Sequence, residues 1–266
     1  MAKPRTLVMS GYGINCERET EFAFNLAGAE PERVHINDLI DGRRKLADYQ
    51  ILAFPGGFSY GDDTGAGKAF ANKVRGNLFG DVRRFVDDGK LIIGICNGFQ
   101  ILTQIGLLPA FDGNYGEKRV ALVHNDSARY IDRWVDLQLF NTNIWTGDLG
   151  KVRLPIAHGE GKFYADPAVL ERIHAKGLVA AQYVRGEICD HFDLPSNPNG
   201  SLDDIAGIGD ESGRVLGFMP HPERAIRFTQ LPHWNFLREK YKRTMQEVPE
   251  EAEGIQIFRN GVNYFK

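Results

Sequence analysis

The sequence feature that most constrains this chain is a short apolar run that ends in a Gly-x-Cys-x-Gly turn. The run covers 91–95, Cys96 occupies the turn, and apolar residues continue beyond it at helical spacing, which predicts a strand, a sharp turn and a helix. The returning chain crowds the backbone at such a tip, so glycine is favoured two positions before and after it, here Gly94 and Gly98. The first N–H groups of the helix favour a thiolate at the tip. Cys96 is therefore a candidate nucleophile, although a cysteine that only packs between two glycines gives the same pattern.

A candidate partner for this thiol lies in Met-Pro-His-Pro-Glu-Arg, residues 219–224. A residue before proline is driven into an extended conformation, and residues two apart in an extended segment share a face, so His221 and Glu223 are expected to point the same way. An imidazole that deprotonates a cysteine needs its other nitrogen held, which a carboxylate can do. The segment predicts a triad with Cys96; the alternative is a proline-rich surface turn with an incidental ion pair.

A second apolar strand, 51–54, ends in a Pro-Gly-Gly turn. Gly56 and Gly57 leave their backbone N–H groups unshielded by a side chain. With the N–H of Asn97, the N–H of Gly57 is a candidate oxyanion hole for a tetrahedral acyl intermediate. Because most turns of this composition only reverse the chain, this prediction depends on Cys96 being reactive.

Five motifs give the chain a resemblance to a known family, the glutaminase subunits of phosphoribosylformylglycinamidine synthase, which are triad-type glutamine amidotransferases of purine biosynthesis. The resemblance spans about residues 5 to 245. The motifs are Pro-Gly-Gly-Phe-Ser-Tyr-Gly-Asp (55–62), Gly-Ile-Cys-Asn-Gly-Phe-Gln (94–100), Ala-His-Gly-Glu-Gly (157–161), Asn-Pro-Asn-Gly-Ser (197–201) and Met-Pro-His-Pro-Glu-Arg (219–224).

The resemblance implies that Cys96 attacks the side-chain amide of glutamine, that His221 shuttles the proton and that Glu223 orients His221. It implies that the ammonia passes to a large synthetase subunit that carries ATP and magnesium, assisted by a small accessory subunit. It also makes further residues candidates for lining the glutamine pocket or facing the partner, although a loop His or Asn is more often a turn former. These candidates are Gly56, Phe58, Gln100, His158, Glu160, Asn197 and Asn199.

Composition narrows the class of protein further. With 266 residues and a net charge of −3, the chain is predicted to form one large α/β domain, and neither a nucleic acid nor a membrane is expected as a partner. The apolar run Leu7-Val8-Met9 near the N-terminus is too short for a signal or membrane segment, so we expect a cytoplasmic location. The cysteines, Cys16, Cys96 and Cys189, show no disulfide framework and no Cys-x-x-Cys pair, so we expect reduced thiols and no protein-bound metal. Cys16 lacks the glycine turn around Cys96 and is interpreted as structural. The loop 62–68 ends in lysine but lacks the Gly-Lys-Ser/Thr of a nucleotide-binding P-loop.

Alternating apolar strands and helices predict a mostly parallel, twisted sheet flanked by helices. The family implies that this is the flavodoxin-like fold of class I glutamine amidotransferases. Strand-like runs with few helices between them predict an added, smaller antiparallel layer. These runs are 120–123, 134–139, 152–156 and 178–184, and a last strand, 215–218, is expected to deliver His221.

The chain is predicted to divide into an amidotransferase domain, 1–246, and a C-terminal extension, 247–266. The extension is predicted to comprise a solvated acidic linker and a β-hairpin that turns at Asn260-Gly261 and docks on this subunit or on a partner. Two other functions remain open on the sequence. One is a stand-alone amidase that uses the same cysteine elbow, and the other is a non-catalytic regulatory subunit that kept the fold.

Overall fold

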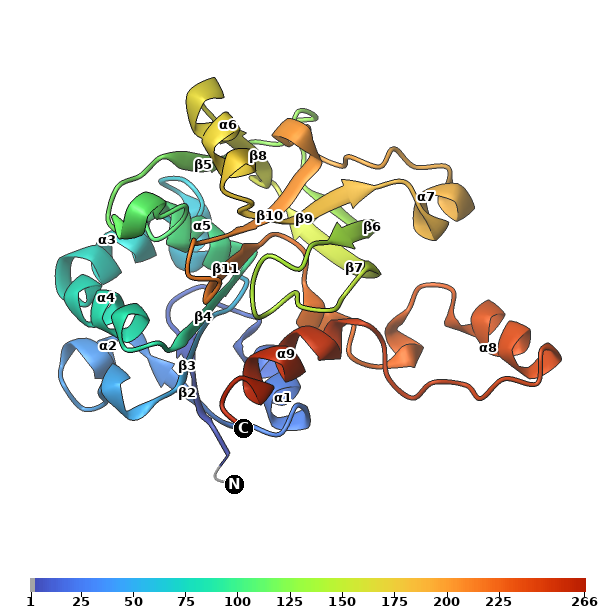
Figure 1. Cartoon of the computed structure of the whole chain (residues 1–266), viewed down its shortest axis with the longest axis horizontal. Coiled ribbons are helices and arrows are strands. Elements are labelled where there is room, and N and C mark those ends of the chain that lie inside the picture. Colours follow the sequence, from blue (N-terminus) through green and yellow to red (C-terminus); the bar gives the residue numbers. More distant parts are fainter. Residues whose placement is uncertain (1–2) are drawn as a thin grey trace.

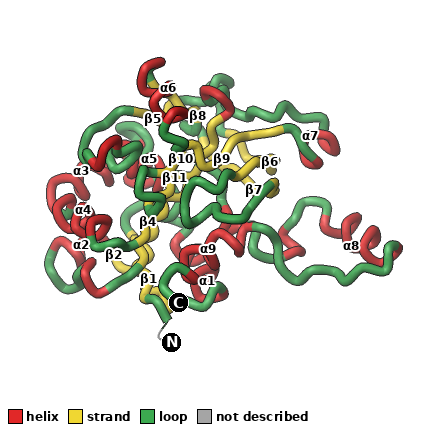
Figure 2. Tube along the Cα trace, in the orientation of Figure 1, coloured by secondary structure: helices red, strands yellow, loops and turns green. Residues whose placement is uncertain are grey.

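The computed structural model describes residues 3–266 and contains a nine-stranded sheet in the order β2-β1-β3-β4-β11-β10-β9-β6-β7 (Figures 1 and 2). The five strands from β2 to β11 pair in parallel, whereas the pairings from β11 through β7 are antiparallel. Strands β5 and β8 form a separate antiparallel pair. The strands are β1 Arg5–Ser10, β2 Glu30–His35, β3 Ile51–Phe54, β4 Leu91–Ile95, β5 Val120–Val123, β6 Ile131–Leu139, β7 Lys151–His158, β8 Lys162–Ala165, β9 Val179–Val184, β10 Ile205–Gly209 and β11 Val215–Phe218.

Helices cover both faces of the parallel part of the sheet. Figure 1 shows α3, α4 and α5 on one side of strands β1 to β4, and α1 with α9 on the other side. The helices are α1 Glu17–Leu26, α2 Ile36–Ile40, α3 Lys68–Asn77, α4 Phe79–Asp87, α5 Asn97–Gln104, α6 Pro167–Ala175, α7 Glu187–Phe192, α8 Trp234–Arg243 and α9 Gly254–Asn263. None of the helices within residues 3–266 has the length and apolar character needed to cross a bilayer.

The fold predicted from the sequence is confirmed, and the burial of its strands explains why. Every residue of β3, β4 and β11 is buried, as a parallel sheet covered on both faces requires of continuous apolar runs. The predicted antiparallel runs are β5, β6, β7 and β9, to within a few residues at their ends. Three of them extend the large sheet, and β5 pairs with β8 in the small one.

The predicted C-terminal hairpin is wrong: these residues form helix α9. Ile255, Phe258 and Val262 recur at helical spacing and are buried in the main core, and the Phe258 ring lies edge-on to that of Phe24 with centroids 4.9 Å apart. Gly261 is not a turn residue, since a Cβ there would lie 2.3 Å from the Trp145 ring. Close helix packing explains the Asn-Gly pair that suggested a hairpin, and the tail is part of this domain's core.

Candidate active site

Cys96 lies on a sharp turn between β4 and α5, as the Gly-x-Cys-x-Gly pattern predicts. Its backbone has φ 51° and ψ −106°, a strained conformation for a residue with a side chain. A Cβ on Gly98 would lie 1.9 Å from the Phe54 carbonyl oxygen, and a Cβ on Gly94 would lie 2.7 Å from the Gly98 backbone. Both glycines are therefore required by close approach of the chain, and the turn holds Cys96 at the end of the strand.

Strand register brings three separate loops to the same edge of the sheet. Strand β4 runs between β3 and β11, with Gly94 paired to Phe54 on one side and to Gly217 on the other. The N–H of Cys96 donates to the Phe218 carbonyl at 2.7 Å. The Pro-Gly-Gly turn, Cys96 and the 219–223 segment therefore meet where the parallel strands end, the usual place for a site in an open α/β sheet.

His221 and Glu223 form a buried pair. The Nδ1 of His221 lies 2.6 Å from the Oε1 of Glu223, and each residue is 1% exposed. The His221 N–H donates to the Pro155 carbonyl at 2.8 Å, which anchors the segment on β7. The Nε2 of His221 is buried and has no hydrogen-bond partner within residues 3–266. This nitrogen is thus available to exchange a proton with a reacting group.

Charges around His221 favour its protonated form. Burial by itself lowers the pKa of His221, but the negative charges of Glu223 and Cys96 outweigh it and raise the pKa well above its ordinary value. A cysteine thiolate beside an imidazolium is the reactive form of a cysteine nucleophile.

The two predicted oxyanion donors have free N–H groups. Among residues 3–266, no acceptor takes the N–H of Gly57 or that of Asn97. Asn97 is the first residue of α5, where a helix leaves its N–H unpaired. Gly57 has φ 151° and a Cβ there would lie 2.7 Å from the Gly13 carbonyl oxygen, so only glycine fits this turn.

A cavity of about 230 Å³ opens beside Cys96. Phe58 and Tyr130, 41% and 51% exposed, lie over it with ring centroids 5.9 Å apart. Two carboxylates, Asp62 and Glu160, line it, and within the described residues its lining contains no lysine or arginine. The lining residues are Gly57, Phe58, Asp62, Cys96, Gln100, His124, Tyr130, Ala157, His158, Gly159 and Glu160.

A polar network connects the elbow helix to one wall of this cavity. The Asn97 side chain donates to Gln100 Oε1 at 2.8 Å and to Asp62 Oδ1 at 3.3 Å, and Gln100 Nε2 donates to the Glu160 carbonyl at 2.6 Å. Glu160 Oε2 in turn accepts the N–H of Ala66 at 3.1 Å. Burial, and less strongly the nearby charge of Glu160, raises the pKa of Asp62 to about 6.

Four of the predicted substrate-binding residues pack against, or hydrogen-bond to, other parts of the protein. Gly56 packs against His221, since a Cβ there would lie 2.6 Å from the His221 ring. His158 lines the cavity, but its Nδ1 is held by Asn125 Oδ1 at 3.1 Å, and burial lowers the pKa of His158 to about 3. Asn197 and Asn199 do not line the cavity; they hold their own turn through bonds to neighbouring backbone groups.

The structure also adds residues that the sequence prediction left out. Asp62 lines the cavity from the turn after β3, and His124 and Tyr130 line it from the connection between β5 and β6. Asp62 lies within the 55–62 motif, which was a usable signal, whereas nothing local distinguishes His124 or Tyr130. Cys16 lies at the start of α1 beside His221 and Glu223. Cys16 reaches this place through packing between segments more than 200 residues apart, and the spacing of residues in the sequence does not predict such a contact.

Comparison with known proteins agrees with this geometry. A family model, the CobB/CobQ-like glutamine amidotransferase domain, matches residues 3–265. The chain is 48% identical over 265 residues to the phosphoribosylformylglycinamidine synthase subunit PurQ of Methanococcus maripaludis strain C5, covering 98% of each chain. It is 43% identical over 268 residues to the same-named subunit of Dehalococcoides mccartyi, covering 99% of this chain and 98% of that one.

Two solved structures resemble this chain in fold. A chain in the structure of PurLQS from Thermotoga maritima aligns with a TM-score of 0.72 at 33% identity, covering 99% of this chain and 100% of that one. A glutamine amidotransferase from Thermotoga maritima, 12% identical with a TM-score of 0.50 and covering 99% of this chain and 92% of that one, shows the shared fold alone. The chain belongs to the glutamine amidotransferase family of the phosphoribosylformylglycinamidine synthase PurQ subunits.

Proposed function

We propose that this chain is the glutaminase subunit of a phosphoribosylformylglycinamidine synthase of purine biosynthesis. It hydrolyses L-glutamine and passes the ammonia to a large synthetase subunit, which uses ATP to convert formylglycinamide ribonucleotide to formylglycinamidine ribonucleotide. The whole assembly is then a carbon–nitrogen ligase with glutamine as amido donor. The observation that carries the proposal is the strained Cys96 elbow beside the buried His221–Glu223 pair.

The arrangement supports acyl transfer through a thioester. The Cys96 sulfur attacks the side-chain carbonyl carbon of glutamine, and its proton resides on His221 Nε2. The N–H groups of Gly57 and Asn97 bind the oxyanion of the tetrahedral intermediate. His221 then gives its proton to the departing nitrogen, which leaves as ammonia. His221 Nε2 next deprotonates a water molecule, which hydrolyses the thioester to glutamate and restores the Cys96 thiol.

The cavity charges suit the free α-ammonium group of L-glutamine. Asp62 and Glu160 place negative charge on the wall formed by Gln100 and the 62–67 loop. We assign Glu160 the ammonium contact, because its Oε2 accepts a single N–H bond and keeps capacity for another donor. Phe58 and Tyr130 would cover the aliphatic part of the substrate.

We place ATP and magnesium on the partner. The glycine-rich loop ending at Lys68 is occupied by its own chain: the N–H of Ala66 binds Glu160 and that of Gly67 binds Asp62. A phosphate at these donors would meet two carboxylates. We propose further that a small accessory subunit completes the assembly.

We assign this chain to the cytoplasm, the compartment that suits its three free thiols, Cys16, Cys96 and Cys189.

We also propose that the isolated chain hydrolyses glutamine slowly and is activated when the synthetase docks. The 62–68 loop closes one wall of the cavity and is the element expected to respond. The Asn197–Ser201 turn is held by its own asparagines and is not expected to move. Docking would then shift the loop toward its competent arrangement.

The test measures glutamine hydrolysis by the purified chain alone and with its synthetase, ribonucleotide and ATP. Cys96→Ser should abolish hydrolysis in both, because a hydroxyl is far harder to deprotonate than a thiol, while the far-UV circular dichroism spectrum is unchanged. A mutant that kept a tenth of the activity would remove Cys96 as nucleophile. Full activity of the lone chain would favour a stand-alone amidase.

A further inference from the structure

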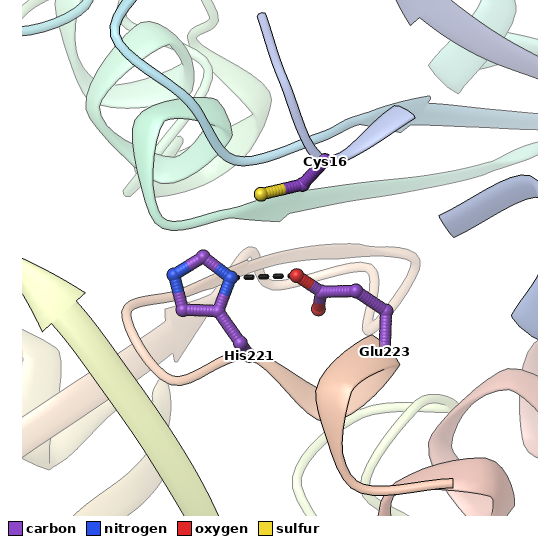
Figure 3. A group of neighbouring side chains, drawn as sticks. All are labelled: Cys16, His221 and Glu223. Carbon is purple, nitrogen blue, oxygen red and sulfur yellow. Dashed lines mark hydrogen bonds and ion pairs between the residues drawn. The ribbon is translucent and has the colours of Figure 1, made fainter. Parts of the chain in front are cut away.

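Cys16 forms a second thiol site beside the catalytic pair. It lies at the start of α1, and Figure 3 shows its sulfur next to the hydrogen-bonded His221 and Glu223. Cys16 is 205 residues from His221 and 207 residues from Glu223 in the sequence, and each of the three residues is 1% exposed. The reaction uses Cys96, so Cys16 has no part in the mechanism derived above.

The ligand atoms of this cluster form a compact group. One sulfur, one imidazole nitrogen and one carboxylate oxygen, from Cys16, His221 and Glu223, all lie within 4.8 Å of one another. The second carboxylate oxygen of Glu223, Oε2, is buried and has no partner within the described part of the chain. Ligands of a tetrahedral zinc lie about 2.0 to 2.3 Å from the ion, hence roughly 3.3 to 3.8 Å from each other, so small side-chain rotations would close the group around an ion.

We propose that Cys16, His221 and Glu223 form an inhibitory binding site for Zn²⁺ or a similar thiophilic divalent cation. A thiolate, an imidazole and a carboxylate are the ligand types that zinc prefers, and three protein ligands leave a fourth position for water. Metal binding rests on this geometry alone, whereas the inhibitory effect rests on the proposed glutaminase function.

Binding would take the catalytic pair apart. The thiol of Cys16 and the Nδ1–H of His221 each lose a proton to solvent, and the Cys16 sulfur, His221 Nδ1 and a Glu223 oxygen each donate an electron pair to the cation. The hydrogen bond between His221 Nδ1 and Glu223 breaks. With the Nδ1 electron pair on the metal, Nε2 holds the remaining imidazole proton and cannot accept another, so Cys96 has no base.

Arg224 is positioned to oppose the cation. Its Nη2 donates to the Cys16 sulfur at 2.9 Å, and its Nε lies 3.9 Å from Glu223 Oε1. The sulfur also donates to Asn15 Oδ1 at 3.3 Å. The Arg224 side chain is 36% exposed and can swing into solvent. The cation must therefore displace a guanidinium, which predicts that removing this charge tightens metal binding.

The experiment measures metal binding on the full chain by equilibrium dialysis with Zn²⁺, and by the thiolate-to-metal absorption band of Co²⁺ as a spectroscopic probe. Cys16→Ala should weaken binding about tenfold or more and abolish the Co²⁺ band, while leaving glutamine hydrolysis in chelator near wild type. Cys16→Ser replaces Cys16→Ala in the same measurements if the alanine variant is destabilised by the cavity that its smaller side chain leaves. Cys189→Ala, at the other non-nucleophilic buried thiol, is the matched control and should bind as wild type.

Two further variants separate this site from its rival, zinc held by Cys96 and His221. Cys96→Ser should keep the Co²⁺–thiolate band, and Arg224→Gln should lower the dissociation constant for Zn²⁺. If the band is lost in Cys96→Ser and kept in Cys16→Ala, the metal binds at the nucleophile and the proposal is wrong. It is equally wrong if wild type shows no saturable binding at a stoichiometry of one.

Discussion

The Nδ1 of His221 lies 2.6 Å from the Oε1 of Glu223, and the two residues are separated only by Pro222. This proline holds the segment so that imidazole and carboxylate share a face, and burial excludes water from the contact. The carboxylate therefore holds Nδ1, and the buried Nε2 is left without a partner among residues 3–266.

Glu223→Ala should lower glutamine turnover about 10²-fold or more, as loss of general-base support does. Without this charge, burial dominates and the pKa of His221 falls. The alkaline limb of the pH profile of kcat/KM, which reports loss of the imidazolium proton, should move to lower pH. Alkylation of Cys96 should remain measurable. Glu239→Ala, on the exposed face of α8, is the control, and an unchanged profile for Glu223→Ala would exclude Glu223 from the triad.

Gly98→Ala should destabilise the fold by about 3 kcal/mol or more, since the new Cβ would meet backbone that cannot rotate away. The clash is with the Phe54 carbonyl oxygen, at 1.9 Å. Gly80→Ala is a matched control, because Gly80 is also the second residue of its helix, α4, and nothing lies within 4 Å of its Cβ position. It should stabilise by about 0.5 to 1 kcal/mol through helix propensity. Chemical denaturation measures both, and equal effects would contradict the close approach.

Asp62→Asn should become progressively more stable than wild type as the pH rises from 4 to 7. The pKa of Asp62 is about 6 in the folded protein against an ordinary value of 3.8, so ionisation between these values costs folding stability, and asparagine escapes that cost. The gain at pH 7 should be about 1 to 2 kcal/mol, allowing for partial solvent screening. Urea denaturation at several pH values measures it, with Asp63→Asn as the baseline for removing a carboxylate from the same loop. A difference between Asp62→Asn and wild type that does not vary with pH would contradict the raised pKa.

Glu160→Gln should raise KM for glutamine about tenfold or more and change kcat less, because the ammonium contact is made equally in the ground state and the transition state. The matched control is a substrate, the glutamine analogue without its α-amino group. Wild type and Glu160→Gln should hydrolyse this analogue with similar kcat/KM. If the substitution impairs both substrates equally, Glu160 only supports the loop through Ala66.

Local sequence determined the elements that carry the chemistry. The glycines around Cys96 and the prolines around His221 act within a few residues, through steric limits on the backbone, so the elbow and the orientation of the triad pair could be predicted. The continuous apolar runs likewise predicted a parallel sheet, because strands buried on both faces have no polar side to alternate with.

Tertiary structure decided what depends on contacts between distant segments. The alternation of Ile255 and Ile257 fits a strand as well as a helix, and packing of Phe258 and Gly261 against Phe24 and Trp145 selected the helix. Asn197 and Asn199 matched a family motif, yet their side-chain oxygens accept backbone N–H groups of their own turn, and the Asn199 amide donates to the Gly161 carbonyl. Cys16 reaches His221 only because α1 and the segment after β11 pack at the same sheet edge. Steric rules act between neighbours in the chain, whereas the partner of a buried side chain is set by the burial of the whole core, which no single segment encodes.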